Sequence, residues 1–217
     1  MSIELLNIDC MEYLAKCKDK EFNLACIDPP YGIGQSGIKN KTRCKLAQAK
    51  DYKPFAGNDI EPPGKDFFIE LFRVSENQII FGANHFMQNI AIGSPCWIVW
   101  DKLNTGDFAD CELAYTSFKS AVRKFSFRWN GMLQGDMSNK EERIHPTQKP
   151  VKLYEWLFSN YAKPGQRILD THLGSASSAI AAHYFCCDFV GCELDKDYFD
   201  AAVERFNRET SQLSMDL

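Results

Sequence analysis

The sequence predicts an α/β fold in which helices cover both faces of a mostly parallel sheet. Short apolar runs alternate with segments of helical periodicity along a chain of 217 residues. Three of these runs end in an acidic residue, namely Asp28, Asp170 and Glu193. A chain of this length fits one large domain. We therefore expect a single domain over residues 1–217, with a loop insertion at about 32–60 that is polar and long enough to be functional.

The first half of the chain begins with a helix signal and a buried strand. Asp9 and Glu12 have the spacing of the N-cap and N3 residues of a helix over 10–17. The apolar run 22–27 is typical of a buried strand, and the acidic Asp28 with two prolines ends it. The elements predicted after the insertion are a helix over 65–75 and strands over 78–82, 96–100 and 112–115.

The second half repeats the alternation after a stretch of weak periodicity over 117–144. Pro150 is typical of a helix start, and the helix that follows has an apolar face of Tyr154, Leu157, Phe158 and Tyr161. The remaining predicted elements are a strand over 166–169, a helix over 178–185, a strand over 188–192 and a final helix with an apolar face of Phe199, Ala202, Val203 and Phe206.

The composition is that of an ordinary globular protein, with 45% hydrophobic and 25% charged residues. No run of 18 apolar residues occurs, and residues 1–9 lack the pattern of a signal peptide, so neither a membrane span nor export is expected. The 9 cysteines include no C-x-x-C pair, and several lie in apolar runs where thiols act as small core residues. We expect a cytoplasmic protein with reduced thiols and no bound metal.

Basic residues concentrate in two segments although the net charge is −4. The candidates for phosphate contacts are Lys39, Lys41, Arg43 and Lys45 in the first segment, and Arg123 and Lys124 in the second. Such clustering can focus a positive field in a chain with a negative total. The alternative interpretation is two solvated loops.

The segment 168–193 has the pattern of a nucleoside-binding βαβ unit. A strand ends at Asp170, a loop of small residues around Gly174 leads into a helix, and Glu193 ends the next strand about 20 residues later. Small residues let the backbone approach a ligand closely, and a carboxylate at the second strand end accepts hydrogen bonds from ribose hydroxyls. A complete G-x-G-x-x-G is absent, which disfavours a dinucleotide. The alternative is a plain turn from strand to helix.

The tetrapeptide Asp28-Pro29-Pro30-Tyr31 follows the buried strand directly. Pro30 has no backbone N–H, so the carbonyl of Pro29 and the carboxylate of Asp28 are able to converge as two acceptors. An amino group with two hydrogens needs two acceptors, and Tyr31 adds an aromatic face. The alternative is a turn that ends the strand and satisfies Asp28 locally.

Together these two segments resemble the amino-methyltransferases of DNA. Because the Asp-Pro-Pro-Tyr motif precedes the glycine-containing loop, the order is similar to that of the permuted β class. The resemblance implies a Rossmann-like methyltransferase fold that uses S-adenosylmethionine, with DNA as partner and adenine N6 as the methyl acceptor. It also implies that Tyr31 stacks on a base flipped out of the duplex. A restriction-modification role and a homodimer are further expectations from the family.

The resemblance assigns roles to individual residues. Asp28, Pro29, Pro30 and Tyr31 become the catalytic motif. Asp9 and Cys10 match the element that contacts the cofactor's adenine, and Glu193 matches the ribose carboxylate. The remaining cofactor-binding residues are Thr147 and Lys149, in a His-Pro-Thr-Gln-Lys-Pro segment, and Asp170, Thr171, Gly174, Ser175 and Ser177 in the loop.

The chain departs from the family pattern in two places. The loop reads Asp170-Thr171-His172 where the family has Asp-Pro-Phe, and Ala176 stands where a second glycine is usual. The target-recognition region, about 117–144, is short. These departures motivate one alternative, a non-catalytic nucleic-acid-binding module with a decayed cofactor loop. Two alternatives for the methyl acceptor also stay open, an N4-cytosine enzyme and an RNA adenine enzyme.

Overall fold

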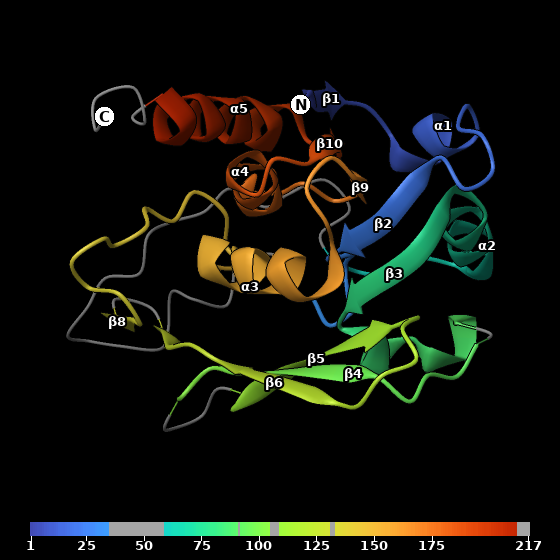
Figure 1. Ribbon diagram of the computed structural model, residues 1–217, viewed down its shortest axis with the longest axis horizontal. Coiled ribbons are helices and arrows are strands. Elements are labelled where there is room, and N and C mark those ends of the chain that lie inside the picture. The colour runs from blue at the N-terminus through green and yellow to red at the C-terminus, as the bar shows by residue number, and fades with distance from the viewer. Residues whose placement is uncertain (35–58, 91, 105–108, 131–132, 212–217) are drawn as a thin grey trace.

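The computed structural model describes residues 1–34, 59–90, 92–104, 109–130 and 133–211. Eight strands form one sheet in the order β1-β10-β9-β2-β3-β5-β4-β6 (Figure 1). The strands are β1 (Ile3–Asn7), β2 (Phe22–Ile27), β3 (Ser75–Phe81), β4 (Trp97–Asp101), β5 (Cys111–Thr116), β6 (Arg123–Ser126), β9 (Arg167–Asp170) and β10 (Asp188–Glu193). A separate pair consists of β7 (Trp129–Asn130) and β8 (Leu133–Gln134).

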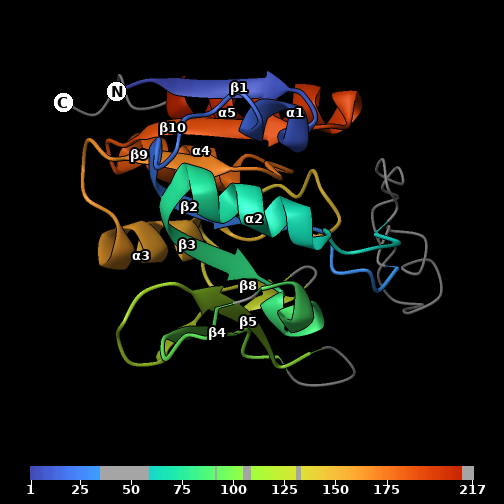
Figure 2. The ribbon, with the colours of Figure 1, turned by 90° about the vertical axis from the view of Figure 1, so that its right-hand side faces the viewer.

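The sheet is mostly parallel, as the sequence predicts. Five neighbouring strands from β1 to β3 pair in parallel, and β5 is antiparallel to both β3 and β4. The strand β1 lies at one edge of the sheet, while β4 and β5 lie towards the other (Figure 2). The strands β9 and β2 are neighbours. The strand that follows β9 in the sequence, β10, lies on one side of this pair, and the strand that follows β2, β3, lies on the other side. The boundary between β2 and β9 is therefore a topological switch point, where ligands of open α/β sheets bind.

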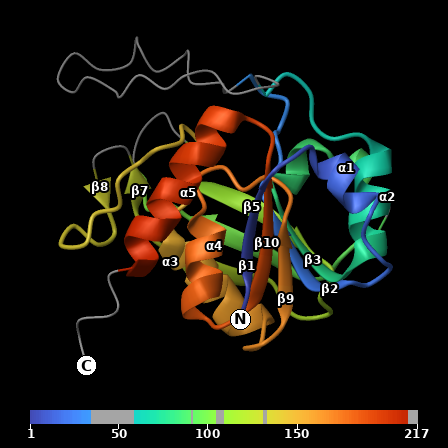
Figure 3. The same ribbon diagram turned by 90° about the horizontal axis from the view of Figure 1, so that it is seen from above.

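Helices cover both faces of this sheet (Figure 3). One face carries α1 (Cys10–Leu14) and α2 (Lys65–Val74), and the other carries α3 (Val151–Tyr161), α4 (Ser177–Tyr184) and α5 (Lys196–Ser211). Two short 3₁₀ turns, Ala83–His85 and Met87–Asn89, follow β3.

The strand β2 shows why helices are needed on both sides. Its Leu24 and Cys26 belong to the apolar cluster beneath α3 and α4, whereas Ala25 and Ile27 belong to the cluster beneath α1 and α2. Side chains alternate along a strand, so the four consecutive apolar residues from Leu24 to Ile27 require cover on both faces of the sheet.

Local signals account for the helix starts that the sequence predicts. Asp9 is the N-cap of α1, and its Oδ1 accepts hydrogen bonds from the N–H groups of Met11 at 2.7 Å and Glu12 at 3.3 Å. Pro150 is the N-cap of α3.

Helix α1 is shorter than the predicted helix over 10–17, because it ends at Leu14. Ala15 to Cys17 continue as a tighter turn, in which the N–H of Cys17 donates to the carbonyl of Leu14.

Most of the predicted insertion at 32–60 lies outside the described residues. Residues 117–144 contain β6, β7 and β8, which the weak periodicity did not predict. Within the described part of the chain, no helix combines the length and apolar character needed to cross a bilayer.

Candidate active site

The two sequence motifs meet at the switch point of the sheet. Asp28 to Tyr31 directly follow β2, and the loop that begins at Asp170 directly follows β9. These two strands pair in parallel, with Ala25 opposite Leu169, so their carboxyl ends lie at the same edge. The structure thus brings together the residues that sequence analysis assigns to catalysis and to cofactor binding.

Asp28 lies in a dense polar network. Its Oδ2 accepts from the ammonium of Lys149 at 2.6 Å, and its Oδ1 accepts from the hydroxyl of Tyr31 at 2.7 Å. Lys149 also donates to the Tyr31 oxygen at 3.1 Å and forms an ion pair with Glu112 at 3.0 Å. Glu112 in turn pairs with Lys102. The sequence assigns Lys149 to the cofactor's methionine end, and the structure adds a direct role at Asp28.

The electrostatics of this network follow from burial and charge pairing. Burial raises the pKa of Asp28, and the Lys149 ammonium opposes that rise. Burial also disfavours the ionised form of Glu112, yet Lys149 and Lys102 lower its pKa to about 2. For Lys149, burial lowers the pKa but Asp28 and Glu112 more than compensate, so its pKa lies above the usual value. Lys149 and Glu112 are therefore charged at neutral pH.

The Asp170 loop is held by backbone and side-chain hydrogen bonds. Asp170 accepts from the N–H of His172 at 3.0 Å and from the hydroxyl of Ser178 at 2.6 Å, and burial raises its pKa to about 7. Gly174 and Ala176 both have positive φ, at 52° and 61°. Glycine adopts this conformation without a steric cost, so Ala176 carries the strain that the departure from the family pattern implied.

Glu193 and Asp9 lie at the same strand edge. The carboxylate of Glu193 accepts from the N–H of Gly174 at 2.9 Å and from that of Asp195 at 3.0 Å. Because β1 and β10 pair with Asn7 opposite Glu193, the segment with Asp9 and Cys10 follows directly beside it. Burial and the neighbouring Asp9 carboxylate raise the pKa of the Cys10 thiol to about 11, so this thiol is neutral.

Lys149 connects the two motifs physically. Its carbonyl accepts a hydrogen bond at 2.8 Å from Ser177 at the start of α4, while its side chain reaches Asp28. Ser177 lies 3.1 Å from the hydroxyl of Ser175. The buried guanidinium of Arg205, on α5, donates to the Ser175 carbonyl at 2.8 Å and to the Ser177 hydroxyl at 2.9 Å. Thr147 contacts the ring of His145 rather than this network.

The ring of Tyr31 is packed in the described structure. It stacks on His85 with centroids 5.2 Å apart and planes inclined by 16°. A Cβ at Gly82, which has φ of 65°, would lie only 2.1–2.4 Å from three atoms of this ring. The glycine is therefore required for Tyr31 to lie against the loop after β3.

Sequence analysis missed four residues of this site: Lys102, Glu112, Arg205 and His85. Glu112 offered a signal, because a glutamate within an apolar strand run is unusual unless it is paired. The other three lie in segments with no distinguishing pattern.

The predicted phosphate contacts divide into two groups. Lys39, Lys41, Arg43 and Lys45 lie outside the described residues. Arg123 and Lys124 are exposed on the edge strand β6, and Lys124 forms an ion pair with Asp101 at 3.2 Å. For both groups, contact with DNA phosphates therefore stays a prediction.

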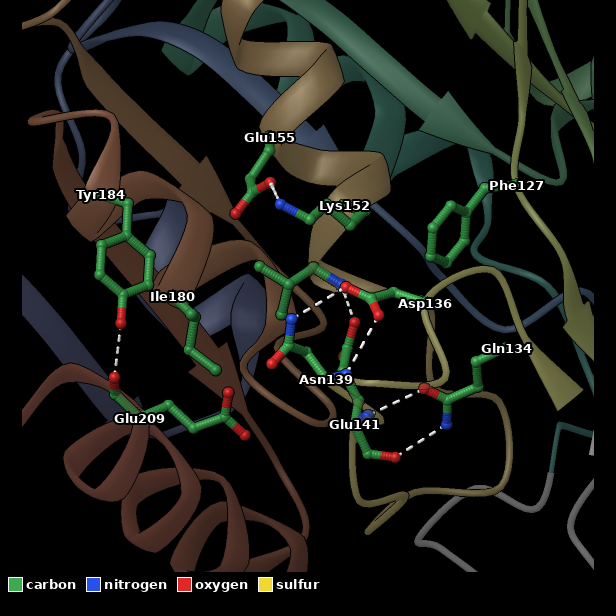
Figure 4. Close-up of a pocket in the computed structure, with 11 residues that line it drawn as sticks. Phe127, Gln134, Asp136, Asn139, Glu141, Lys152, Glu155, Ile180, Tyr184 and Glu209 are labelled. Carbon is green, nitrogen blue, oxygen red and sulfur yellow. Dashed lines mark hydrogen bonds and ion pairs between the residues drawn. The ribbon is translucent and has the colours of Figure 1, made fainter. Parts of the chain in front are cut away.

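A hollow of about 270 Å³ lies between the helices α3, α4 and α5 on one side and Phe127 with residues 134–141 on the other (Figure 4). None of the predicted site residues lines it. Its charged lining consists of Asp136, Glu141, Glu155 and Glu209 with the single cation Lys152. This excess of carboxylates among the described lining residues disfavours binding of phosphate in the hollow.

Solved structures share this architecture. TTHA0409 of Thermus thermophilus, crystallised with S-adenosyl-L-methionine, aligns with a TM-score of 0.60 and 17% identity, covering 98% of each chain. The cytosine-N4-specific PvuII DNA methyltransferase aligns with a TM-score of 0.61 and 12% identity, covering 97% of this chain and 91% of that one. The fold is therefore the Rossmann-like fold of methyltransferases, as the sequence predicts.

The sequence comparisons narrow this class to a family. The family described as DNA methylase matches residues 95–204, about half of the chain. The type II methyltransferase M2.DpnII of Streptococcus pneumoniae is 22% identical over 240 residues, which cover 94% of this chain and 90% of that protein. The chain belongs to the DNA methylase family.

Proposed function

We propose that this protein transfers a methyl group from S-adenosylmethionine to N6 of adenine in DNA. The observation that carries the proposal is the double attachment of Lys149. Its side chain binds Asp28 of the Asp-Pro-Pro-Tyr motif, and its carbonyl binds Ser177 of the glycine-containing loop. The amine site and the cofactor loop are thereby adjacent at the switch point, where one methyl group is able to pass between two ligands.

The residues of the Asp170 loop fit S-adenosylmethionine. A Cβ added at Gly174 would have no neighbour closer than 3.9 Å, so the backbone there is open to a ligand. The carboxylate of Glu193 is the acceptor for the ribose hydroxyls, and Asp9 and Cys10 contact the adenine ring. Thr147, Lys149, Asp170, Thr171, Ser175 and Ser177 complete the predicted set. When bound, the cofactor supplies an electrophilic methyl on its sulfonium.

The catalytic motif acts on the target amine. The lone pair of an adenine amine is delocalised into the ring, so attack requires the nitrogen to become tetrahedral and to develop positive charge. The carboxylate of Asp28 and the carbonyl of Pro29 accept its two hydrogens and stabilise that charge. Pro30 fixes the turn, and Tyr31 moves from His85 to stack on the flipped base.

The basic residues contact the DNA backbone in this proposal. Lys39, Lys41, Arg43 and Lys45, in the insertion at 32–60, clamp the target strand, and Arg123 and Lys124 contact phosphates from the short recognition region at 117–144. We also propose one domain of the permuted β class that serves a restriction-modification system. The name of the type II methyltransferase M2.DpnII supports that role.

The acceptor base separates two candidate functions. The likeness in fold to the cytosine-N4-specific PvuII enzyme favours cytosine N4 as the second candidate. Asp28 at the first motif position favours adenine, because the resemblance associates serine there with cytosine enzymes.

Product analysis tests the proposal. The purified protein is incubated with S-adenosylmethionine and mixed-sequence DNA, and the digested nucleosides are identified by mass spectrometry. We expect N6-methyladenine. N4-methylcytosine would establish the second candidate. Methylation of RNA without methylation of DNA would overturn both candidate functions.

A further inference from the structure

We propose that Glu112 is a positioning residue that keeps Lys149 protonated at Asp28, an inference that rests on the proposed function. The four charged side chains form a continuous row from Lys102 to Glu112, Lys149 and Asp28. The comparisons and the motifs assign no role to Glu112 or Lys102. In this arrangement Asp28 accepts hydrogen bonds from the amine, and the ammonium of Lys149, 2.6 Å from Oδ2, opposes transfer of the amine's proton to that carboxylate.

The row is built from elements that are far apart in the sequence. Lys102 follows β4 and Glu112 lies on the adjacent strand β5, where it pairs with Trp100. Lys149 precedes α3, and Asp28 follows β2. The exposed fractions of the side chains are 18% for Lys102, 21% for Glu112, 5% for Lys149 and 16% for Asp28. Charges this far from water persist only when they are paired.

The charges of the row balance. Two ammonium groups alternate with two carboxylates, so each inner group lies between two opposite charges. Lys149 is the inner ammonium, held by Asp28 on one side and by Glu112 on the other. Other titratable groups also face Lys149 or Asp28, and they are Cys26, Tyr31, His145, Tyr154 and Asp170. Burial keeps Cys26, Tyr31 and Tyr154 neutral, and Lys149 forms ion pairs with Asp28 and Glu112, so Glu112 is the second anion in contact with Lys149.

The hydrogen bonds define what Asp28 is able to do. Lys149 occupies Oδ2 and Tyr31 occupies Oδ1, and a carboxylate has about four acceptor positions in total. Room remains for an N–H of the substrate. A protonated Lys149 beside Oδ2 disfavours protonation of that carboxylate. The excess proton of the methylated amine therefore leaves to water.

Removing the charge of Glu112 is expected to change the pH dependence of the turnover number. In Glu112→Gln, Lys149 keeps a single anionic partner in a buried site, so its pKa falls. The turnover number of the wild type shows no loss as the pH rises from about 8 to about 9.5, since Lys149 stays charged. At saturating S-adenosylmethionine, the turnover number of Glu112→Gln falls as the pH rises through that window.

Lys102→Met is the matched control. It removes the outer cation and leaves both anions on Lys149, so no alkaline loss is expected. Because Glu112→Gln leaves Lys102 without its partner, the double variant Lys102→Met, Glu112→Gln guards against misfolding. The double variant is expected to show the same alkaline loss of turnover as Glu112→Gln, because Asp28 is again the single anionic partner of Lys149.

The test uses the full chain, with methyl transfer to DNA measured against pH and cofactor binding measured by calorimetry. A wild-type pH profile in both Glu112→Gln and the double variant, with cofactor binding intact, would overturn the inference. An alkaline loss in Lys102→Met equal to that of Glu112→Gln would overturn it as well. Failure of the proposed function is a different result, in which the wild type itself transfers no methyl group to DNA.

Discussion

The buried guanidinium of Arg205 holds the cofactor loop to the last helix, and its removal tests whether the loop depends on that anchor. Arg205 is fully buried and donates to the Ser175 carbonyl, the Ser177 hydroxyl and the carboxylates of Glu141 and Glu209, at 2.7–3.2 Å. Substitution by methionine keeps the apolar stem and deletes these donors. The loop carbonyl then loses this donor, and the Glu141 carboxylate, which is only 13% exposed, loses its cationic partner and keeps the N–H of Val151.

The size of the effect follows from the charge that is left behind. Breaking a buried ion pair by removing one partner costs about 3–5 kcal/mol. In a chain of this size a change of 1 kcal/mol shifts the melting temperature by about 2–4 °C, so Arg205→Met lowers it by roughly 6–20 °C. The double variant Arg205→Met, Glu141→Gln recovers part of this loss, because the orphaned carboxylate is also removed.

Urea unfolding measures the free energy directly, and Arg208→Met is the matched control. Arg208 is 44% exposed and pairs with Glu142 at 3.7 Å, so its loss costs less than about 1 kcal/mol. A surface ion pair contributes at most about 1 kcal/mol to the free energy of unfolding. If the free energy of unfolding of Arg205→Met differs from that of the wild type by no more than this, Arg205 does not anchor the cofactor loop.

Three further predictions concern the cofactor, pH and DNA. Glu193→Ala raises the dissociation constant of S-adenosylmethionine by roughly ten- to a hundredfold in calorimetry, because the Gly174 N–H and the ribose both lose their acceptor. Burial raises the pKa of Asp170 from 3.8 to about 7, so the stability it contributes is present below pH 3.8 and is lost as pH rises to about 7. Asp170→Asn removes this slope, up to about 1.4 kcal/mol per pH unit in urea unfolding. Replacing Arg123 and Lys124 with Ala makes the salt dependence of DNA affinity shallower, by about 0.9 in the logarithmic slope for each phosphate that the protein no longer neutralises.

Each of these predictions has a result that contradicts it. Asp200→Ala, at an exposed position on α5, is the control for Glu193, and equal cofactor affinity in both variants would refute the ribose assignment. An unchanged slope of stability between about pH 4 and about pH 7 in Asp170→Asn would show that this carboxyl titrates normally. An unchanged salt slope after replacement of Arg123 and Lys124 would remove β6 from the DNA interface.

The fold was predictable where burial leaves a strong pattern. The apolar run 22–27 matches β2 residue for residue, because every position from Leu24 to Ile27 is buried and no other element suits such a run. The strand β6 lies at the sheet edge with Arg123, Lys124 and Ser126 exposed, so it has no apolar alternation to detect.

The site was predictable where function imposes unusual local sequence. Prolines after an acidic strand end and small residues before a helix are local signals. The ion pair of Lys149 with Asp28 joins residues 121 positions apart, and Arg205 reaches Ser175 across 30 positions. Such pairings depend on the packing of whole elements, which no window of sequence contains.

The central claim is that Asp28 holds the methyl acceptor beside the cofactor loop, and methyl transfer by Asp28→Ala tests it most directly. Transfer of tritiated methyl groups to DNA is measured in parallel with calorimetric binding of S-adenosylmethionine. We expect that methyl transfer falls at least about 100-fold, because the carboxylate that stabilises the developing positive charge is lost, while cofactor binding persists. Turnover at the wild-type rate with Asp28→Ala would contradict it.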